Sequence, residues 1–377
     1  MRRSGVRIFP GVHAPPAPPA GGFFVAGRPA RAVTVPDLPP YRPPRPLRSG
    51  HLQSVLPTLF RRVRVTYRRE RLELADGDFL DLDWAGPPGG ARVAVVAHGL
   101  EGSTDRAYVR GMARALARRG WTVCAWNLRG CSGEPNRLAR TYHSGVSDDL
   151  DAVVRRVLDR PAPAACAPGQ SGRGGAEAVA VVGFSLGGNV TLKWLGERGG
   201  DADRRVVGGV GISVPVDLAS ASAVMERPSR RIYMARFLRS LGDKVADKAA
   251  RHEGVPDAAP VRGMRSFREF DGWVTAPLHG FDSAEDYWAR ASALPLLDAV
   301  RVPTLLVQAL DDPFLSPACY PRAEAARNPA LTLLTPRHGG HVGFVGRGGE
   351  FWSETVTARF LDAALHETPR PTAPPDA

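Results

Sequence analysis

The stretch that decides the fold runs Ala178-Val-Ala-Val-Val-Gly183-Phe-Ser185-Leu-Gly187-Gly-Asn189-Val-Thr-Leu-Lys-Trp194. Its first five residues form an apolar run that predicts a buried strand, and the residues after Gly187 predict a helix. Gly183 and Gly187 stand two residues on either side of Ser185. Because glycine carries no Cβ, this spacing lets strand and helix approach closely around a sharp turn that exposes the serine hydroxyl.

A serine in such a turn lies at a helix N-terminus, where backbone amides favour developing negative charge. The strand, the Gly-x-Ser-x-Gly turn and the helix together form a nucleophile elbow, which predicts a catalytic role for Ser185. The alternative is a glycine-rich turn whose serine has no chemical role. The short motif is common, so residues further along the chain must decide between the two.

Strand and helix patterns alternate on both sides of the elbow. Apolar runs predict buried strands at residues 93–97, 122–126, 206–214, 304–310 and 331–334. Helical patterns fall at residues 106–119, 148–158 and 350–364. Alternating residues between Val63 and Trp84, with the turn Asp76-Gly77, predict an antiparallel entry to the sheet. The expected fold class is α/β, with a mostly parallel central sheet and helices on both faces.

The alternation lapses between residues 217 and 297, where residues 230–241 and 283–293 predict helices and residues 270–281 an irregular segment. An insertion of this size between strands is expected to form a helical lid over the site. The sequence does not decide whether the aromatic residues of this insertion line the pocket or pack the interior of the lid. This applies to Trp273, Phe281, Tyr287 and Trp288.

A serine nucleophile needs a histidine to accept its proton and an acid to orient that histidine. In this fold both follow the serine along the chain, in loops after late strands. Asp311-Asp312 follows the strand at 304–310, and His338-Gly-Gly-His341 follows the last strand. We expect Asp312, which lies further past the strand end. We expect His341 because the two glycines before it let the loop bring its ring close to Ser185.

Acyl transfer also needs N–H donors for the tetrahedral oxyanion. Leu186, directly after the nucleophile, is expected to supply the first donor of this oxyanion hole. The second should come from His98-Gly-Leu100-Glu-Gly102, which follows the strand at 93–97, with Leu100 as the donor. His98 itself is expected to be a structural residue that braces this loop.

The net charge of +12 is concentrated at one end of the chain. Residues 1–70 hold 13 arginines against Asp37 and Glu70, which leaves the other residues nearly neutral. Nucleic-acid binding is therefore not expected, because no basic stripe crosses the catalytic body. The basic N-terminus allows weak peripheral contact with an anionic membrane, although coding bias explains the arginines more simply.

Other signals exclude further classes of protein and bound the domain. The cysteines Cys124, Cys131, Cys166 and Cys319 are scattered and lack metal-ligand spacing, and no glycine-rich phosphate loop occurs. We therefore expect no metal and no cofactor. No apolar run is long enough for a membrane span or a signal core, so the cytoplasm is the expected location.

The sequence also bounds the domain. Residues 1–45 and 367–377 are expected to be disordered tails around one catalytic domain at 46–366.

The chain resembles the YheT-like α/β-hydrolases, a family that includes the animal abhydrolase lipases. The likeness covers residues 41–365 and rests on several motifs: His51-Leu-Gln-Ser54, Leu72 to Asp81, His98-Gly-Leu-Glu-Gly-Ser103, Asn127-Leu-Arg-Gly-Cys131, Gly183 to Asn189, Thr275 to Phe281, Asp311-Asp-Pro-Phe314 and Gly339 to Phe344. In the family pattern the triad falls on Ser185, Asp312 and His341. The resemblance implies a carboxylic-ester hydrolase for short- or medium-chain acyl esters.

The expected activity is therefore serine ester hydrolysis of a small-molecule acyl ester through an acyl-enzyme on Ser185. A thioesterase or acyltransferase with the same triad is one alternative. A non-catalytic binding protein that kept the scaffold is another, since a fold alone does not assign a function.

Overall fold

The computed structural model describes residues 38–160, 175–346 and 350–367 of the 377-residue chain. These residues build an eight-stranded sheet in the order β1-β2-β4-β3-β5-β6-β7-β8. The strands are β1 (Arg68–Glu73), β2 (Phe79–Ala85), β3 (Arg92–Ala97), β4 (Thr122–Trp126), β5 (Ala178–Phe184), β6 (Val206–Ile212), β7 (Thr304–Val307) and β8 (Leu331–Leu334). Strand β2 pairs antiparallel with β1 and β4, and every other pair is parallel. The predicted mostly parallel sheet with an antiparallel entry is confirmed.

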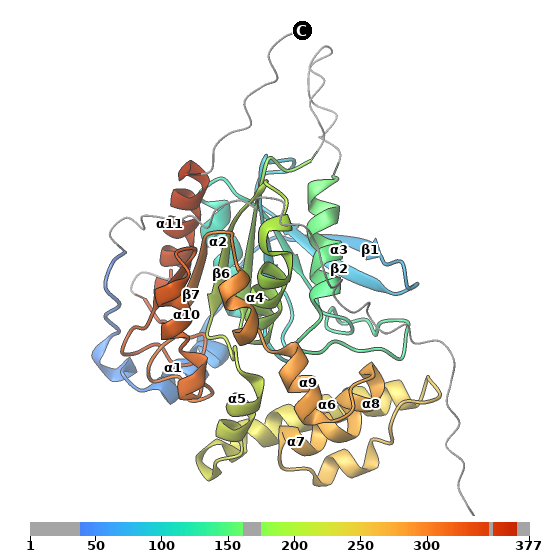
Figure 1. Cartoon of the computed structure of the whole chain (residues 1–377). Helices are drawn as coiled ribbons and strands as arrows, with labels where there is room; N and C mark the ends of the chain where they lie inside the picture. The colour runs from blue at the N-terminus through green and yellow to red at the C-terminus, as the bar shows by residue number, and fades with distance from the viewer. Residues whose placement is uncertain (1–37, 161–174, 347–349, 368–377) are drawn as a thin grey trace, which may run out of the picture.

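Helices cover both faces of this sheet, as expected (Figure 1). Helices α2 (Ala107–Ala117) and α11 (Trp352–Glu367) contact each other on one face. Helices α3 (Ser147–Leu158) and α4 (Leu186–Arg198) contact each other on the opposite face. Every residue of the central strand β5 is consequently buried, which explains why its sequence is a continuous apolar run.

A helical insertion connects β6 to β7 and gathers beyond one end of the sheet (Figure 1). Its main helices are α5 (Leu218–Met225), α6 (Arg231–Ala249), α7 (Phe267–Phe270), α8 (Ala276–His279) and α9 (Ala284–Ala291). The prediction of an irregular segment at residues 270–281 is wrong. Helix α7, a π-helical turn at Asp271–Thr275 and α8 follow one another there. A capping box between Ser266 and Glu269 starts this helical run, and Gly280 ends it in a left-handed conformation.

Helix α1 (Gly50–Phe60) is additional to the predicted elements, and it begins where the Ser49 side chain accepts a hydrogen bond from the Leu52 N–H. The strand predicted from Val63 begins later, at Arg68. Another short helix, α10 (Arg322–Arg327), precedes β8. None of the described helices combines the length and the apolar composition needed to cross a bilayer.

Most of both predicted tails lies outside the described residues. Where the N-terminal segment enters the structure, Leu38 and Tyr41 pack against the core. The Tyr41 ring lies 5.9 Å from the Phe344 ring and 5.2 Å from the Trp352 ring.

Candidate active site

Ser185 sits between the last residue of β5 and the first residue of α4, at φ 52° and ψ −120°. This backbone conformation is unfavourable for a residue with a side chain, and the surrounding glycines sustain it. A Cβ on Gly183 would lie 2.2 Å from the Gly187 carbonyl oxygen, and a Cβ on Gly187 would lie 2.3 Å from the His98 carbonyl oxygen. The glycine spacing is therefore required by the closeness of strand, helix and neighbouring loop.

The predicted acid and histidine lie next to this serine. The Nε2 atom of His341 is 2.8 Å from Ser185 Oγ, and its Nδ1 atom lies 2.9 and 3.1 Å from the two carboxylate oxygens of Asp312. These distances fit a serine that donates to Nε2 and an Nδ1–H that donates to the carboxylate. The Asp312 side chain is fully buried, and one of its oxygens also accepts from the Phe314 N–H.

The two rejected candidates form a second pair beside the first. His338 Nδ1 lies 3.3 Å from Asp311 Oδ2, while Asp311 Oδ1 accepts from the Gly340 N–H at 2.9 Å. Asp311 therefore holds the loop that carries His341, and these hydrogen bonds go to His338 and Gly340 rather than to the His341 ring. The sequence argument that separated Asp312 from Asp311 agrees with this geometry.

Helix α1 braces the same loop from the other end of the chain. The His341 N–H donates to Ser54 Oγ at 2.8 Å, and Ser54 Oγ donates to the Gly50 carbonyl at 2.7 Å. A Cβ on Gly340 would lie 2.3 Å from that Gly50 carbonyl oxygen. Sequence reasoning missed this positioning role of Ser54, for which the motif His51-Leu-Gln-Ser54 was the available signal.

Leu100 and Leu186 both border the cavity that contains Ser185. The Leu186 N–H is at the first position of α4, where a helix has no internal acceptor for it. Leu100 lies in a tight turn closed by the Gly102 N–H on the Gly99 carbonyl at 3.0 Å. A Cβ on Gly99 would lie 3.0 Å from the Ser185 Cβ, so this turn passes directly over the serine.

His98 braces that turn, as expected for a structural histidine. Its ring is fully buried, with Nδ1 2.8 Å from the Gly99 carbonyl oxygen and Nε2 accepting from the Leu128 N–H at 3.1 Å. Burial lowers the pKa of His98 to about 4, so the ring remains neutral at neutral pH. A neutral ring provides the one donor and one acceptor that the two contacts require.

The turn is also fastened to the helical insertion through Glu101. This residue has φ 52°, and its carboxylate accepts from Tyr142 and from Ser240 of α6. Lys244 of α6 forms an ion pair with the same carboxylate at 2.9 Å. The position of α6 therefore constrains the backbone next to the Leu100 N–H.

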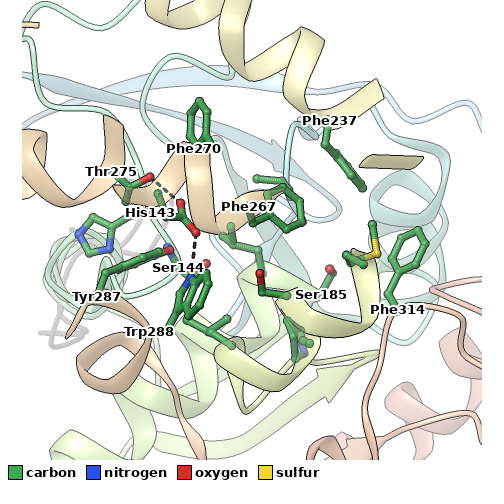
Figure 2. A pocket seen from close by; sticks show the side chains of 18 of the residues that line it. His143, Ser144, Ser185, Phe237, Phe267, Phe270, Thr275, Tyr287, Trp288 and Phe314 are labelled. Carbon is green, nitrogen blue, oxygen red and sulfur yellow. Dashed lines mark hydrogen bonds between the residues drawn. The ribbon is translucent and has the colours of Figure 1, made fainter. Parts of the chain in front are cut away.

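An apolar cavity of about 140 Å³ opens beside Ser185 under the insertion. Figure 2 shows Phe267, Phe270 and Trp288 among the residues that line it. The sequence left undecided which aromatic residues of the insertion line the pocket. Of these, Tyr287 and Trp288 line this cavity. Trp273 does not: it is largely exposed, and its Nε1–H donates to the Asp257 carbonyl. Phe281 packs against His143 and Tyr287 behind the cavity wall.

The wall of this cavity also contains a carboxyl group, Asp271. It accepts hydrogen bonds from Thr275 Oγ1 at 2.7 Å and from Trp288 Nε1 at 2.8 Å, drawn as dashed lines in Figure 2. Burial in these apolar surroundings raises the pKa of Asp271 to about 6. The carboxyl group is consequently ionised at neutral pH only at a cost to stability.

Asp271→Asn should stabilise the protein at alkaline pH and much less at acidic pH. The folded protein protonates Asp271 near pH 6, and an unfolded aspartate does so near pH 4. Stability is therefore lost as pH rises from about 4 to about 6, by up to about 3 kcal/mol. In urea unfolding at pH 8, the variant should have a higher free energy of unfolding than the wild type by up to that amount. At pH 4.5 most of this difference should disappear. A difference independent of pH would contradict the assignment.

Comparison with known proteins agrees with the fold. Residues 93–354 match the model of the alpha/beta hydrolase family. "Putative esterase YheT" of Escherichia coli is 39% identical over 81% of this chain and 86% of its own length. Human phospholipase ABHD3 is 28% identical over 78% of this chain and 71% of its own. A monoacylglycerol lipase of Saccharomyces cerevisiae is 28% identical over 71% of this chain and 58% of its own.

The family match spans well over half of the chain and includes the elbow, the turn at Leu100 and both loops that follow the late strands. The similarity to YheT extends further, to most of both chains. The chain therefore belongs to the α/β-hydrolase family, among the esterase- and lipase-like relatives of YheT.

Proposed function

We propose that this protein is a serine carboxylic-ester hydrolase that cleaves short- to medium-chain acyl esters through an acyl-enzyme on Ser185. The observation that carries the proposal is the His341 ring, which lies 2.8 Å from Ser185 Oγ on one side and 2.9 Å from Asp312 on the other. This arrangement supplies a nucleophile, a general base and a group that orients the base.

In the proposed reaction, Ser185 Oγ attacks the ester carbonyl while His341 Nε2 takes its proton. The backbone N–H groups of Leu100 and Leu186 stabilise the oxyanion. His341 then returns the proton to the leaving alcohol as the tetrahedral intermediate collapses to the acyl-enzyme. Water attacks the acyl-enzyme with His341 again as base, and the carboxylic acid leaves with Ser185 restored.

The acyl group would occupy the cavity beneath the helical insertion. Its walls are mainly aliphatic and aromatic, and its volume of about 140 Å³ favours a chain of limited length. The insertion would then act as the lid that was expected from the sequence, because Phe267 and Phe270 of α7 form part of the cavity wall.

A fluorophosphonate probe tests the proposal directly. The folded protein should be labelled on Ser185, as identified by peptide mass spectrometry. With p-nitrophenyl hexanoate it should release a burst of about one equivalent of nitrophenolate if deacylation is slower than acylation. A folded protein that leaves Ser185 unlabelled and cleaves no ester would instead be a non-catalytic member of the family.

A further inference from the structure

A second and larger cavity also borders the nucleophile. It has a volume of about 470 Å³ and is bordered by α1, the turn at Leu100 and α6. Ser185, His341, Leu100, Phe237 and Phe314 border both this cavity and the acyl cavity. An ester with its carbonyl carbon at Ser185 and its acyl chain in the apolar cavity would place its alcohol part here.

The alcohol-side cavity is strongly cationic, whereas the acyl cavity is not. Its lining contains five arginines and two acids, a net charge of +3, contributed by Arg61, Arg62, Arg106, Arg110, Arg236, Glu101 and Asp105. Among the described lining residues of the acyl cavity, Asp271 is the one acidic side chain, and the lining contains no lysine or arginine. Positive charge is therefore confined to the side where the leaving group would lie.

Some of these arginines already have carboxylate partners. Arg61 pairs with Glu354, Arg110 pairs with Asp105, and Glu101 is neutralised by Lys244. Within the described parts of the chain, Arg62, Arg106 and Arg236 form no ion pair. The unbalanced charge thus belongs to these three side chains.

The three arginines reach the cavity from separate elements. Arg62 follows α1, Arg106 precedes α2, and Arg236 lies on α6. Arg106 also donates to the Glu101 carbonyl at 2.7 Å, which places its guanidinium beside the turn that carries Leu100. Arg62 and Arg236 are exposed side chains that line the cavity.

We propose that the alcohol part of the substrate carries a phosphate group, which Arg62, Arg106 and Arg236 bind. A guanidinium presents planar paired donors that match phosphate oxygens, and its weak hydration lowers the cost of binding in a cavity. This inference rests on the proposed ester hydrolysis. Family membership alone leaves the alcohol open, because the relatives include both a phospholipase and a monoacylglycerol lipase by name.

The test compares esters that share one acyl group and differ in the alcohol. Wild-type protein is assayed with 1-hexanoylglycerol, 1-hexanoylglycerol 3-phosphate, 1-hexanoylglycero-3-phosphocholine and hexanoyl-CoA, all below their aggregation limits. We expect kcat/KM to be at least tenfold higher for the phosphate-bearing substrates. The ranking among them distinguishes a phosphomonoester, a lipid headgroup and a phosphorylated thioester as the source of the phosphate.

Variants then link that preference to the arginines. Arg62→Gln combined with Arg236→Gln should lower the ratio of phosphorylated to neutral kcat/KM at least tenfold. The control, Arg239→Gln, removes an exposed arginine of α6 that does not border the cavity. Fluorophosphonate labelling of Ser185 reports that each variant is folded around its site. Equal rates for neutral and phosphorylated esters, or an unchanged ratio in the double variant, would overturn the proposal.

A binding measurement separates this inference from the proposed function. Calorimetry should detect glycerol 3-phosphate binding to wild-type protein and weaker binding by at least tenfold to the double variant, with no binding of glycerol. If no ester is cleaved but this pattern appears, the ester hydrolase proposal fails and the phosphate site stands. If esters are cleaved and glycerol 3-phosphate binds no better than glycerol, the phosphate site fails alone.

Discussion

Ser185→Ala should lower kcat for p-nitrophenyl hexanoate by about 10⁶-fold, the loss typical when a serine nucleophile is removed from a complete triad. His341 Nε2 then has no hydroxyl to deprotonate, although the cavity and the proposed oxyanion donors, Leu100 and Leu186, remain. The residual rate should stay above that in water because those donors still act on the carbonyl. Stopped-flow measurement should find no burst in the variant.

The stability of this variant provides the necessary control. Alanine keeps the Cβ of serine, so the strained backbone at φ 52° is retained and the urea midpoint should change little. A variant that keeps its fold but loses less than tenfold in kcat would show that Ser185 is not the nucleophile.

The two histidines should differ in the same assay. His341→Gln should lower kcat almost as much as Ser185→Ala. His338→Gln alters the neighbouring pair with Asp311 and should lower kcat less than tenfold.

The elbow could be predicted because its geometry is encoded locally. The apolar strand, the two glycines and the helix that follow one another around Ser185 each act within a few residues. The alternating strands and helices likewise follow from periodicity within single elements, and the parallel sheet follows from that alternation. Short elements inside the insertion were harder, because the capping box at Ser266 and the π-helical turn leave little periodicity to detect.

Contacts between distant segments could not be predicted from the same patterns. Ser54 meets the His341 N–H across 287 positions of sequence, and nothing in the pattern around Ser54 names that partner. The cationic cavity is a similar case. Arginines are so frequent in the N-terminal 70 residues that Arg62 reads as part of a compositional bias. Only folding brings it to the same cavity as Arg106 and Arg236.

Asp312→Asn should lower kcat by about 10⁴-fold while leaving KM nearly unchanged. The substitution keeps the size of the side chain but replaces a carboxylate that accepts from His341 Nδ1–H at 2.9 Å. An amide nitrogen facing Nδ1 would favour the tautomer with its proton on Nε2, which cannot accept the proton of Ser185. The amide would also fail to stabilise the imidazolium that forms during attack.

The neighbouring carboxyl group offers a matched comparison for this prediction. Asp311→Asn keeps an oxygen that can accept from the Gly340 N–H and changes only the pair with His338. We expect it to lower kcat less than tenfold, so the two variants should differ by about 10³-fold. Single-turnover rates measured across pH 6 to 9 would exclude a difference caused by product release. Equal losses in the two variants would mean that the loop, rather than the orientation of the His341 ring, limits the reaction.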